Sequence, residues 1–124
     1  KKRKNVTVCR GRLCGDRDGI WLDALVDTGN SLREPVGGKP VSVVEAGVLD
    51  RLEGVKKPEK LKLIPYRSIG RENGLMEGYE VPEIVIDHEG EMLRREKVVV
   101  GISRTEISTD GRYQMILHPD LYRE

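Results

Sequence analysis

Short runs of aliphatic and β-branched residues recur along the chain, and clusters of glycine, proline, asparagine and aspartate separate them. The first run begins at Val6, is followed by the turn-forming stretch 15–19, and continues as the apolar run 20–26. A strand that is buried on both faces produces such an apolar run, because none of its side chains faces water. The pattern therefore predicts a β-hairpin that ends at Asp27.

Further strand signals follow at short intervals, over residues 41–44, 61–68, 75–86, 95–102 and 113–117. One helical pattern interrupts them, since Val44, Val48 and Leu52 recur every four residues and Gly54 provides a stop. Pro82 cannot donate a ladder hydrogen bond, so it predicts an edge or a bulge in its run. Several short strands and one short helix predict a mainly-β domain that closes partly into a barrel.

The size of the chain fits one domain. Its 124 residues leave little room for a second core, no apolar run could span a bilayer, and no signal-peptide pattern opens the sequence. Residues 1–12 carry six basic side chains and no acidic ones, although the whole chain has a net charge of +1. We expect a single domain over residues 5–124, with residues 1–12 as a basic flank that includes the first strand.

The basic flank has three interpretations. It can attract nucleic acid or anionic lipid, it can follow a membrane helix, or it can be a solvated terminus. Aromatic residues make up 4% of the chain, and single-strand-binding barrels usually stack bases on aromatic rings. We therefore expect no nucleic-acid partner.

No metal or cofactor site is predicted. Cys9 and Cys14 are the only cysteines, and no second pair completes a zinc site. The two histidines, His88 and His118, lie far apart in the sequence without a partner at ligand spacing. We interpret both cysteines as reduced thiols.

The tripeptide Asp27-Thr28-Gly29 directly follows the apolar run that ends at Val26. A buried strand can carry a carboxylate to a fixed point, and a glycine lets the chain turn there so that backbone amides reach the carboxylate. The threonine hydroxyl can lock the loop through a further hydrogen bond. All three residue types also favour turns, so an ordinary turn after a strand is the alternative interpretation.

In this context the tripeptide resembles the active-site loop of the aspartic proteases. In those enzymes two aspartates lie side by side and share one proton, so one carboxylate activates a water while the other donates to the scissile carbonyl. This chain has a single Asp-Thr-Gly. A dyad therefore requires Asp27 of two identical chains to meet across a two-fold axis, as in the retroviral-type enzymes.

Two later features also resemble the retroviral-type enzymes. The run Val98-Val99-Val100-Gly101 is similar to their apolar segment that ends in glycine and packs beside the catalytic loop. Residues 64–74 are similar to the flap, a glycine-tipped hairpin that covers the bound peptide and excludes water. The flap residues expected to bind substrate are Tyr66, Gly70 and Gly74.

Longer blocks of sequence resemble the sporulation sigma-E factor-processing peptidases. The similar blocks are residues 27–35, 38–41, 64–70, 74–76, 100–103 and 113–119. The resemblance implies a protein of the cell membrane of an endospore-forming bacterium, with a multi-span N-terminal membrane domain and a protease domain on the cytoplasmic side. It also implies removal of the N-terminal pro-segment of an inactive sigma factor, in response to a signalling protein of the forespore. Residues 1–12 would then flank the membrane.

These observations lead to one functional hypothesis and one rival. We expect an aspartic endopeptidase of retropepsin-like fold, active as a homodimer, with Asp27 as the catalytic residue, Thr28 and Gly29 supporting its loop, and Gly101 beside it. The rival is a non-catalytic β-barrel module that docks a protein partner. Asn30 stands where retroviral and pepsin-like enzymes have Ala or Ser, and the sequence does not define its hydrogen bonds.

Overall fold

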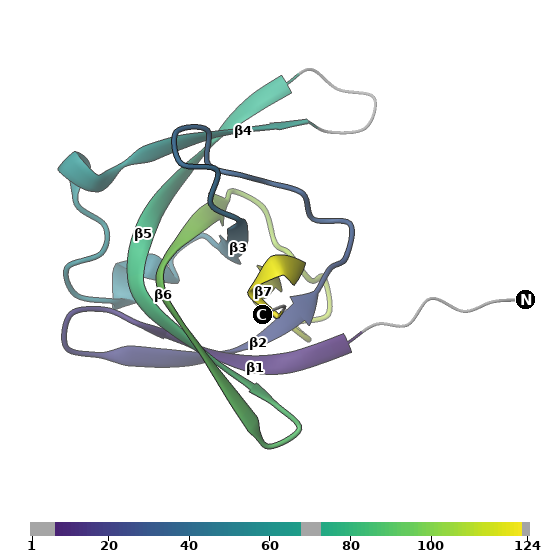
Figure 1. Cartoon of the computed structure of the whole chain (residues 1–124). Helices are drawn as coiled ribbons and strands as arrows, with labels where there is room; N and C mark the ends of the chain where they lie inside the picture. The colour runs from purple at the N-terminus through teal and green to yellow at the C-terminus, as the bar shows by residue number, and fades with distance from the viewer. Residues whose placement is uncertain (1–6, 68–72, 123–124) are drawn as a thin grey trace, which may run out of the picture.

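The structure is a computed structural model that describes residues 7–67 and 73–122 (Figure 1). Its strands are β1 (Thr7–Cys14), β2 (Gly19–Val26), β3 (Val41–Glu45), β4 (Lys62–Arg67), β5 (Asn73–His88), β6 (Glu91–Ser103) and β7 (Met115–Leu117). Three short 3₁₀ helices connect them, η1 (Leu49–Arg51), η2 (Pro58–Lys60) and η3 (Pro119–Leu121). Within the described residues no helix is both long enough and apolar enough to cross a bilayer.

Six of these strands form a closed barrel. Neighbouring strands follow the order β1-β2-β7-β3-β6-β5, and β5 pairs back onto β1. The strand β4 pairs only with β5, and the two form a hairpin that extends beyond the barrel (Figure 1). The predicted mainly-β barrel is confirmed, and the ring of strands is closed where the sequence predicted partial closure.

The first predicted hairpin is confirmed residue by residue. β1 and β2 pair antiparallel from Thr7 opposite Val26 to Cys14 opposite Gly19. The connecting turn is closed by the Gly15 N–H, which donates to the Asp18 carbonyl at 2.8 Å. Two other pairings are parallel, β2 with β7 and β3 with β6, so residues far apart in the sequence complete the ring.

Aliphatic side chains fill the barrel. Those with no exposed surface include Leu13, Ala24, Val44, Ile84, Ile86, Met115 and Leu117. Each large aliphatic side chain that is fully buried in this way contributes about 1.5–3 kcal/mol through the hydrophobic effect. A core without phenylalanine is therefore sufficient because the six strands of the barrel direct their inward side chains into one cluster.

Pro82 lies where β5 changes partners. On one edge β5 pairs with β4 through residues 73–78 and then with β1 through residues 83–87, so Pro82 falls in the gap. On the other edge the register with β6 passes over Pro82 and Lys97, and Lys97 has a φ of 55°. The sequence predicted an edge or a bulge here, and the structure shows a gap between successive strand partners, where the N–H that proline lacks is not required.

The helical pattern is realised as a single 3₁₀ turn. Val44 belongs to β3, where it pairs with Ile102 and Met115, and Val48 and Leu52 flank η1 with their side chains in the core. At Val44, pairing in the sheet therefore prevails over the four-residue periodicity that predicted a helix.

Two glycines face each other where the β4–β5 hairpin leaves the barrel. Gly78 of β5 pairs with Gly101 of β6. A Cβ at Gly78 would lie 2.5 Å from Ile64 Cδ1 and 3.1 Å from the Val100 carbonyl oxygen, and a Cβ at Gly101 would overlap the sulfur of Met76. Ile64 and Met76 belong to the hairpin, so the missing side chains allow the hairpin to pack closely onto the barrel.

Substitution Gly78→Ala is predicted to lower the free energy of unfolding by about 1–3 kcal/mol, because the added methyl group overpacks this contact. Gly11→Ala is the matched control, since Gly11 is also buried in a strand and a Cβ there has no neighbour nearer than 3.6 Å. Urea unfolding of both variants measures the effect. Equal unfolding free energies would contradict close packing at Gly78.

Candidate active site

Asp27 follows β2 directly, at the point where that strand leaves the barrel, and its side chain is half-buried. Its backbone N–H donates to the carbonyl of Leu117 on β7 at 3.4 Å, so the neighbouring parallel strand holds the start of the loop. The Gly29 N–H donates to Asp27 Oδ1 at 2.9 Å, and the Asn30 N–H donates to the Asp27 carbonyl at 3.0 Å. The turn that carries the carboxylate therefore also orients it.

Gly29 contributes through its lack of a side chain. A Cβ at this position would stand 3.3 Å from Asp27 Oδ1, the atom that accepts the Gly29 N–H. Any larger residue would crowd the carboxylate that its own amide holds. Thr28 is exposed, and among the described residues its hydroxyl has no hydrogen-bond partner.

Asn30 provides the lock that the sequence suggested for the threonine. Its Nδ2 donates to the Val41 carbonyl at 3.0 Å, and its Oδ1 accepts the Leu32 N–H at 2.9 Å. The second bond is an asparagine turn, in which the side chain binds the backbone two residues further along. That preference was the sequence signal for this residue, whereas the bond to Val41 depends on the tertiary structure.

A small group of apolar residues, here called the bridging cluster, connects the Asp27 loop with the β4–β5 hairpin. Its members are the buried Val41, Ile64 and Val99, with Leu32 and Met76 packed against them. They come from the loop after Asp27 and from β3, β4, β5 and β6. The position of the hairpin is therefore coupled by direct packing to the loop that carries the carboxylate.

The segment after the loop is held by charged side chains. Arg33 forms an ion pair with Asp120 of η3 and donates from Nη1 to the Gly38 carbonyl at 3.0 Å. The buried Glu34 carboxylate accepts the N–H groups of Val36 and Gly37, each at 2.8 Å. These backbone donors, Gly37 first, hold the pKa of Glu34 below its ordinary value, so it stays ionised at neutral pH.

Gly101 is not in the strand next to Asp27. It lies inside β6, and β7 and β3 separate β6 from β2. Gly101 lies near the side chain of Val41, and the carbonyl of Val41 accepts the Asn30 amide. The strand beside Asp27 is β7, which the sequence predicted as a strand without connecting it to the loop. A parallel neighbour can come from any distance along the chain, so a local pattern does not reveal it.

The expected flap residues lie on the hairpin as far as the structure describes them. Tyr66 of β4 pairs with Gly74 of β5, and its ring covers Gly74, where a Cβ would lie 2.7 Å from the ring. Tyr66 also lines a pocket of about 300 Å³ together with residues 31–33. The hairpin therefore lies beside the segment that follows the tripeptide. Gly70 lies outside the described residues.

Other reactive groups are poorly placed for catalysis. Cys9 and Cys14 are free and buried, and burial is the main reason that the pKa of each thiol is raised. A buried thiol with a raised pKa is a weak nucleophile. Within the described part of the chain no three His, Cys, Asp or Glu side chains form a group that could hold a metal ion.

Substitution Asn30→Asp is predicted to lower the free energy of unfolding by about 1–3 kcal/mol, because a carboxylate cannot donate to the Val41 carbonyl and leaves it unpaired. Ser31→Ala, one residue away at an exposed position, is the control and is expected to change little. Chemical unfolding of the two variants measures the difference. An Asn30→Asp variant as stable as the control would show that this bond does not hold the loop.

Comparison with known proteins adds evidence independent of the geometry. The chain is 29% identical over 124 residues to the sporulation sigma-E factor-processing peptidase of Bacillus subtilis (strain 168), a match that covers 82% of this chain and 40% of that protein. The protein of the same name from Priestia megaterium is 29% identical over 122 residues, with the same coverage. A provisionally named sporulation sigma factor-processing peptidase of Bacillus thuringiensis subsp. kurstaki is 30% identical over 122 residues, covering 82% of this chain and 76% of that protein.

The chain thus spans about two fifths of the length of the first two relatives. No solved structure matches it significantly. The model of one protein family, Peptidase_U4, described as sporulation factor SpoIIGA, matches residues 1–121. That match covers nearly the whole chain and agrees with the names of the relatives, and the chain therefore belongs to the Peptidase_U4 family of sporulation factor SpoIIGA.

Proposed function

We propose that this chain is the catalytic domain of an aspartic endopeptidase that removes the N-terminal pro-segment of a sporulation sigma factor. The observation that carries the proposal is the position of the Asp27 carboxylate. Asp27 directly follows the barrel strand β2, and the backbone amide of Gly29 holds its carboxylate. The segment after this turn lies beside the β4–β5 hairpin, which can cover a peptide. The names of the relatives, which refer to processing of sigma-E factor, support the substrate class.

The active site needs two copies of the chain. Peptide hydrolysis by this route requires one carboxylate that accepts a proton from water and one that donates a proton to the scissile carbonyl. A single chain supplies one Asp-Thr-Gly, and its Thr28 and Gly29 are exposed, which leaves the loop accessible to a second copy. A two-fold axis beside this loop brings Asp27 of both chains together.

The chemistry then follows from the shared proton. The ionised carboxylate removes a proton from the bound water, the oxygen of that water attacks the carbonyl carbon, and the protonated carboxyl donates to the carbonyl oxygen. Collapse of the tetrahedral intermediate breaks the C–N bond, while the protonated carboxyl donates to the leaving nitrogen and the ionised carboxylate removes a hydroxyl proton from the intermediate. The pair then again holds one proton. The β4–β5 hairpin binds the main chain of the peptide and limits access of other water.

In our proposal this domain lies at a membrane as part of the whole protein. Residues 1–12 act as the basic flank of an N-terminal membrane domain, and the catalytic domain lies on the cytoplasmic side. Tethering to a membrane raises the effective concentration of the two halves of the site, so a weak interface suffices. A signalling protein of the forespore controls the activity, directly or through a further partner.

Substitution Asp27→Asn is predicted to reduce cleavage of the pro-sigma factor by at least about a thousandfold, because the amide can neither accept nor share the catalytic proton. Asp23→Asn is the matched control, since Asp23 lies four residues earlier, on β2, with its side chain 41% exposed. Gel analysis and mass spectrometry of the product measure cleavage. Normal processing by Asp27→Asn would exclude the aspartic mechanism.

Co-expression tests the shared site separately. With equal amounts of wild-type chain and Asp27→Asn chain, random pairing leaves about one quarter of the dimers with two aspartates, so activity per total dimer should fall to about that fraction. Asp23→Asn in the same mixture should leave activity unchanged. Activity that follows the amount of wild-type chain, at about one half, would show that one chain suffices.

A further inference from the structure

β5 and β6 separate at the base of the hairpin and leave a fork between them (Figure 1). Their last pair on this side is Gly78 with Gly101. Beyond it, residues 73–77 pair only with β4, and residues 102–103 pair only with β3, within the described chain. The two strand edges that face the fork therefore have main-chain groups without a strand partner. Edges of this kind accept an added strand.

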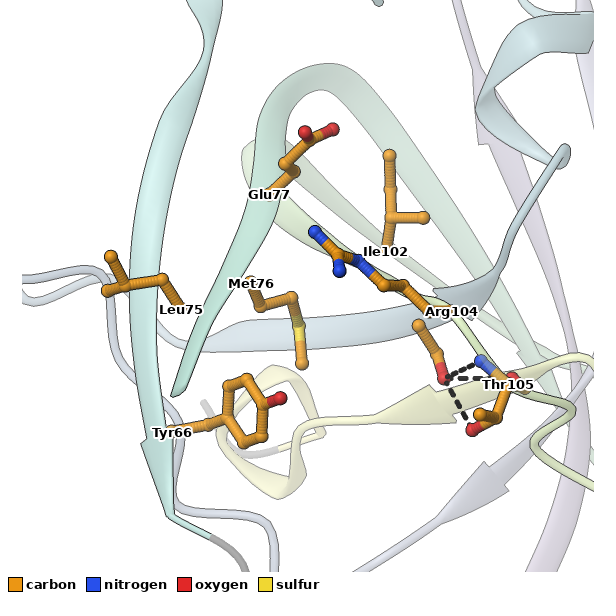
Figure 2. A pocket seen from close by; sticks show the side chains of 8 residues that line it. Tyr66, Leu75, Met76, Glu77, Ile102, Arg104 and Thr105 are labelled. Atoms are coloured by element: carbon orange, nitrogen blue, oxygen red, sulfur yellow. Dashed lines mark hydrogen bonds between the residues drawn. The ribbon is translucent and has the colours of Figure 1, made fainter. Parts of the chain in front are cut away.

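A pocket of about 450 Å³ occupies the fork, as Figure 2 shows. Its walls are Tyr66, Leu75, Met76 and Glu77 on the hairpin side and Ile102, Ser103, Arg104 and Thr105 on the other. The Thr105 N–H donates to Ser103 Oγ at 3.2 Å, and that hydroxyl donates to the Thr105 carbonyl at 2.8 Å. These two bonds hold the second wall in a fixed turn.

We propose that this pocket is a specificity subsite, in which an extended segment of the substrate lies as a strand in the fork and inserts one large apolar side chain between Met76 and Ile102. The inference rests on the proposed peptidase function. The aliphatic and aromatic side chains of the walls favour an apolar occupant. Glu77 and Arg104 carry opposite charges at the same pocket, so they give no net attraction for a charged side chain.

Side chains of the hairpin link this pocket to the segment that follows Asp27. Tyr66 lines this pocket and also the smaller one that contains residues 31–33. Met76 packs in the bridging cluster with Leu32, five residues after Asp27. A peptide that crosses the Asp27 loop beneath the hairpin can therefore enter the fork without leaving the protein surface. Alternate side chains of an extended strand point to one side, so a single residue of the substrate faces the pocket.

Two substitutions test the proposal, one that narrows the pocket and one that widens it. Thr105→Trp adds volume to its wall at an exposed position, and Leu75→Ala removes volume at a residue that is 60% exposed. Met92→Ala is the matched control, because Met92 is also an apolar strand residue with 60% exposure but does not line the pocket. The substrate is a pro-sigma factor in which each residue around the cleavage site is changed in turn to alanine, leucine and tryptophan.

At one substrate position, Thr105→Trp should lower kcat/KM for leucine relative to alanine by about tenfold or more, the usual effect of lost space in an apolar pocket. Leu75→Ala should shift the preference at the same position toward tryptophan. The control, Met92→Ala, should keep the wild-type preference among alanine, leucine and tryptophan at every position. Circular dichroism identifies any variant that does not fold, and Leu75→Ala then tests the subsite alone.

The outcomes separate this inference from the proposed function. Suppose that Asp27→Asn is inactive but neither pocket variant changes the relative kcat/KM for alanine, leucine and tryptophan at any substrate position. The subsite is then overturned and the peptidase assignment stands. If Asp27→Asn remains active, the aspartic mechanism falls, and the affinities of the pocket variants for the same substrate series decide the subsite. Unchanged affinities at every position would then overturn it as well.

Discussion

The structure depends on the parallel pairing of β2 with β7. β7 has only three residues, yet it lies between β2 and β3 and so completes the ring of strands. Its Met115 and Leu117 are fully buried in the core, and the Leu117 carbonyl accepts the N–H of Asp27. The same short strand therefore completes the barrel and fixes the start of the Asp27 loop. The next residue, His118, continues this connection because its N–H donates to Ser42 Oγ of β3.

The candidate site combines the Asp27 loop with the β4–β5 hairpin. The carboxylate of Asp27 is held by the Gly29 amide, and Asn30 ties the loop to β3, so hydrogen bonds within the chain organise the loop. Within the described part of the chain β4 pairs only with β5, and Ile64 and Met76 of the hairpin occupy the space left by two glycines. The bridging cluster connects these two parts by direct packing.

Much of this organisation could be predicted where the physical cause is local. The hairpin from β1 to β2 follows from an apolar run and a turn-forming stretch, and the irregularity at Pro82 follows from its missing N–H. The pattern at Val44, Val48 and Leu52 predicted a helix longer than the one observed, because Val44 pairs with neighbouring strands in the sheet. For Gly101, a resemblance between short segments predicted a position beside the Asp27 loop, and the structure places this glycine in β6, separated from β2 by two strands.

The sequence by itself determined the fold class, the turn that presents Asp27, and the need for a second copy if two aspartates are to meet. Residue periodicity and turn preference depend on neighbours within a few residues, and the single Asp-Thr-Gly can be counted without any structure. Only the tertiary structure decided that β7 lies beside Asp27, that Asn30 reaches Val41, and that β5 and β6 open into a fork. These contacts join segments distant in the sequence, and their partners are selected by packing and closure of the whole barrel rather than by any local pattern.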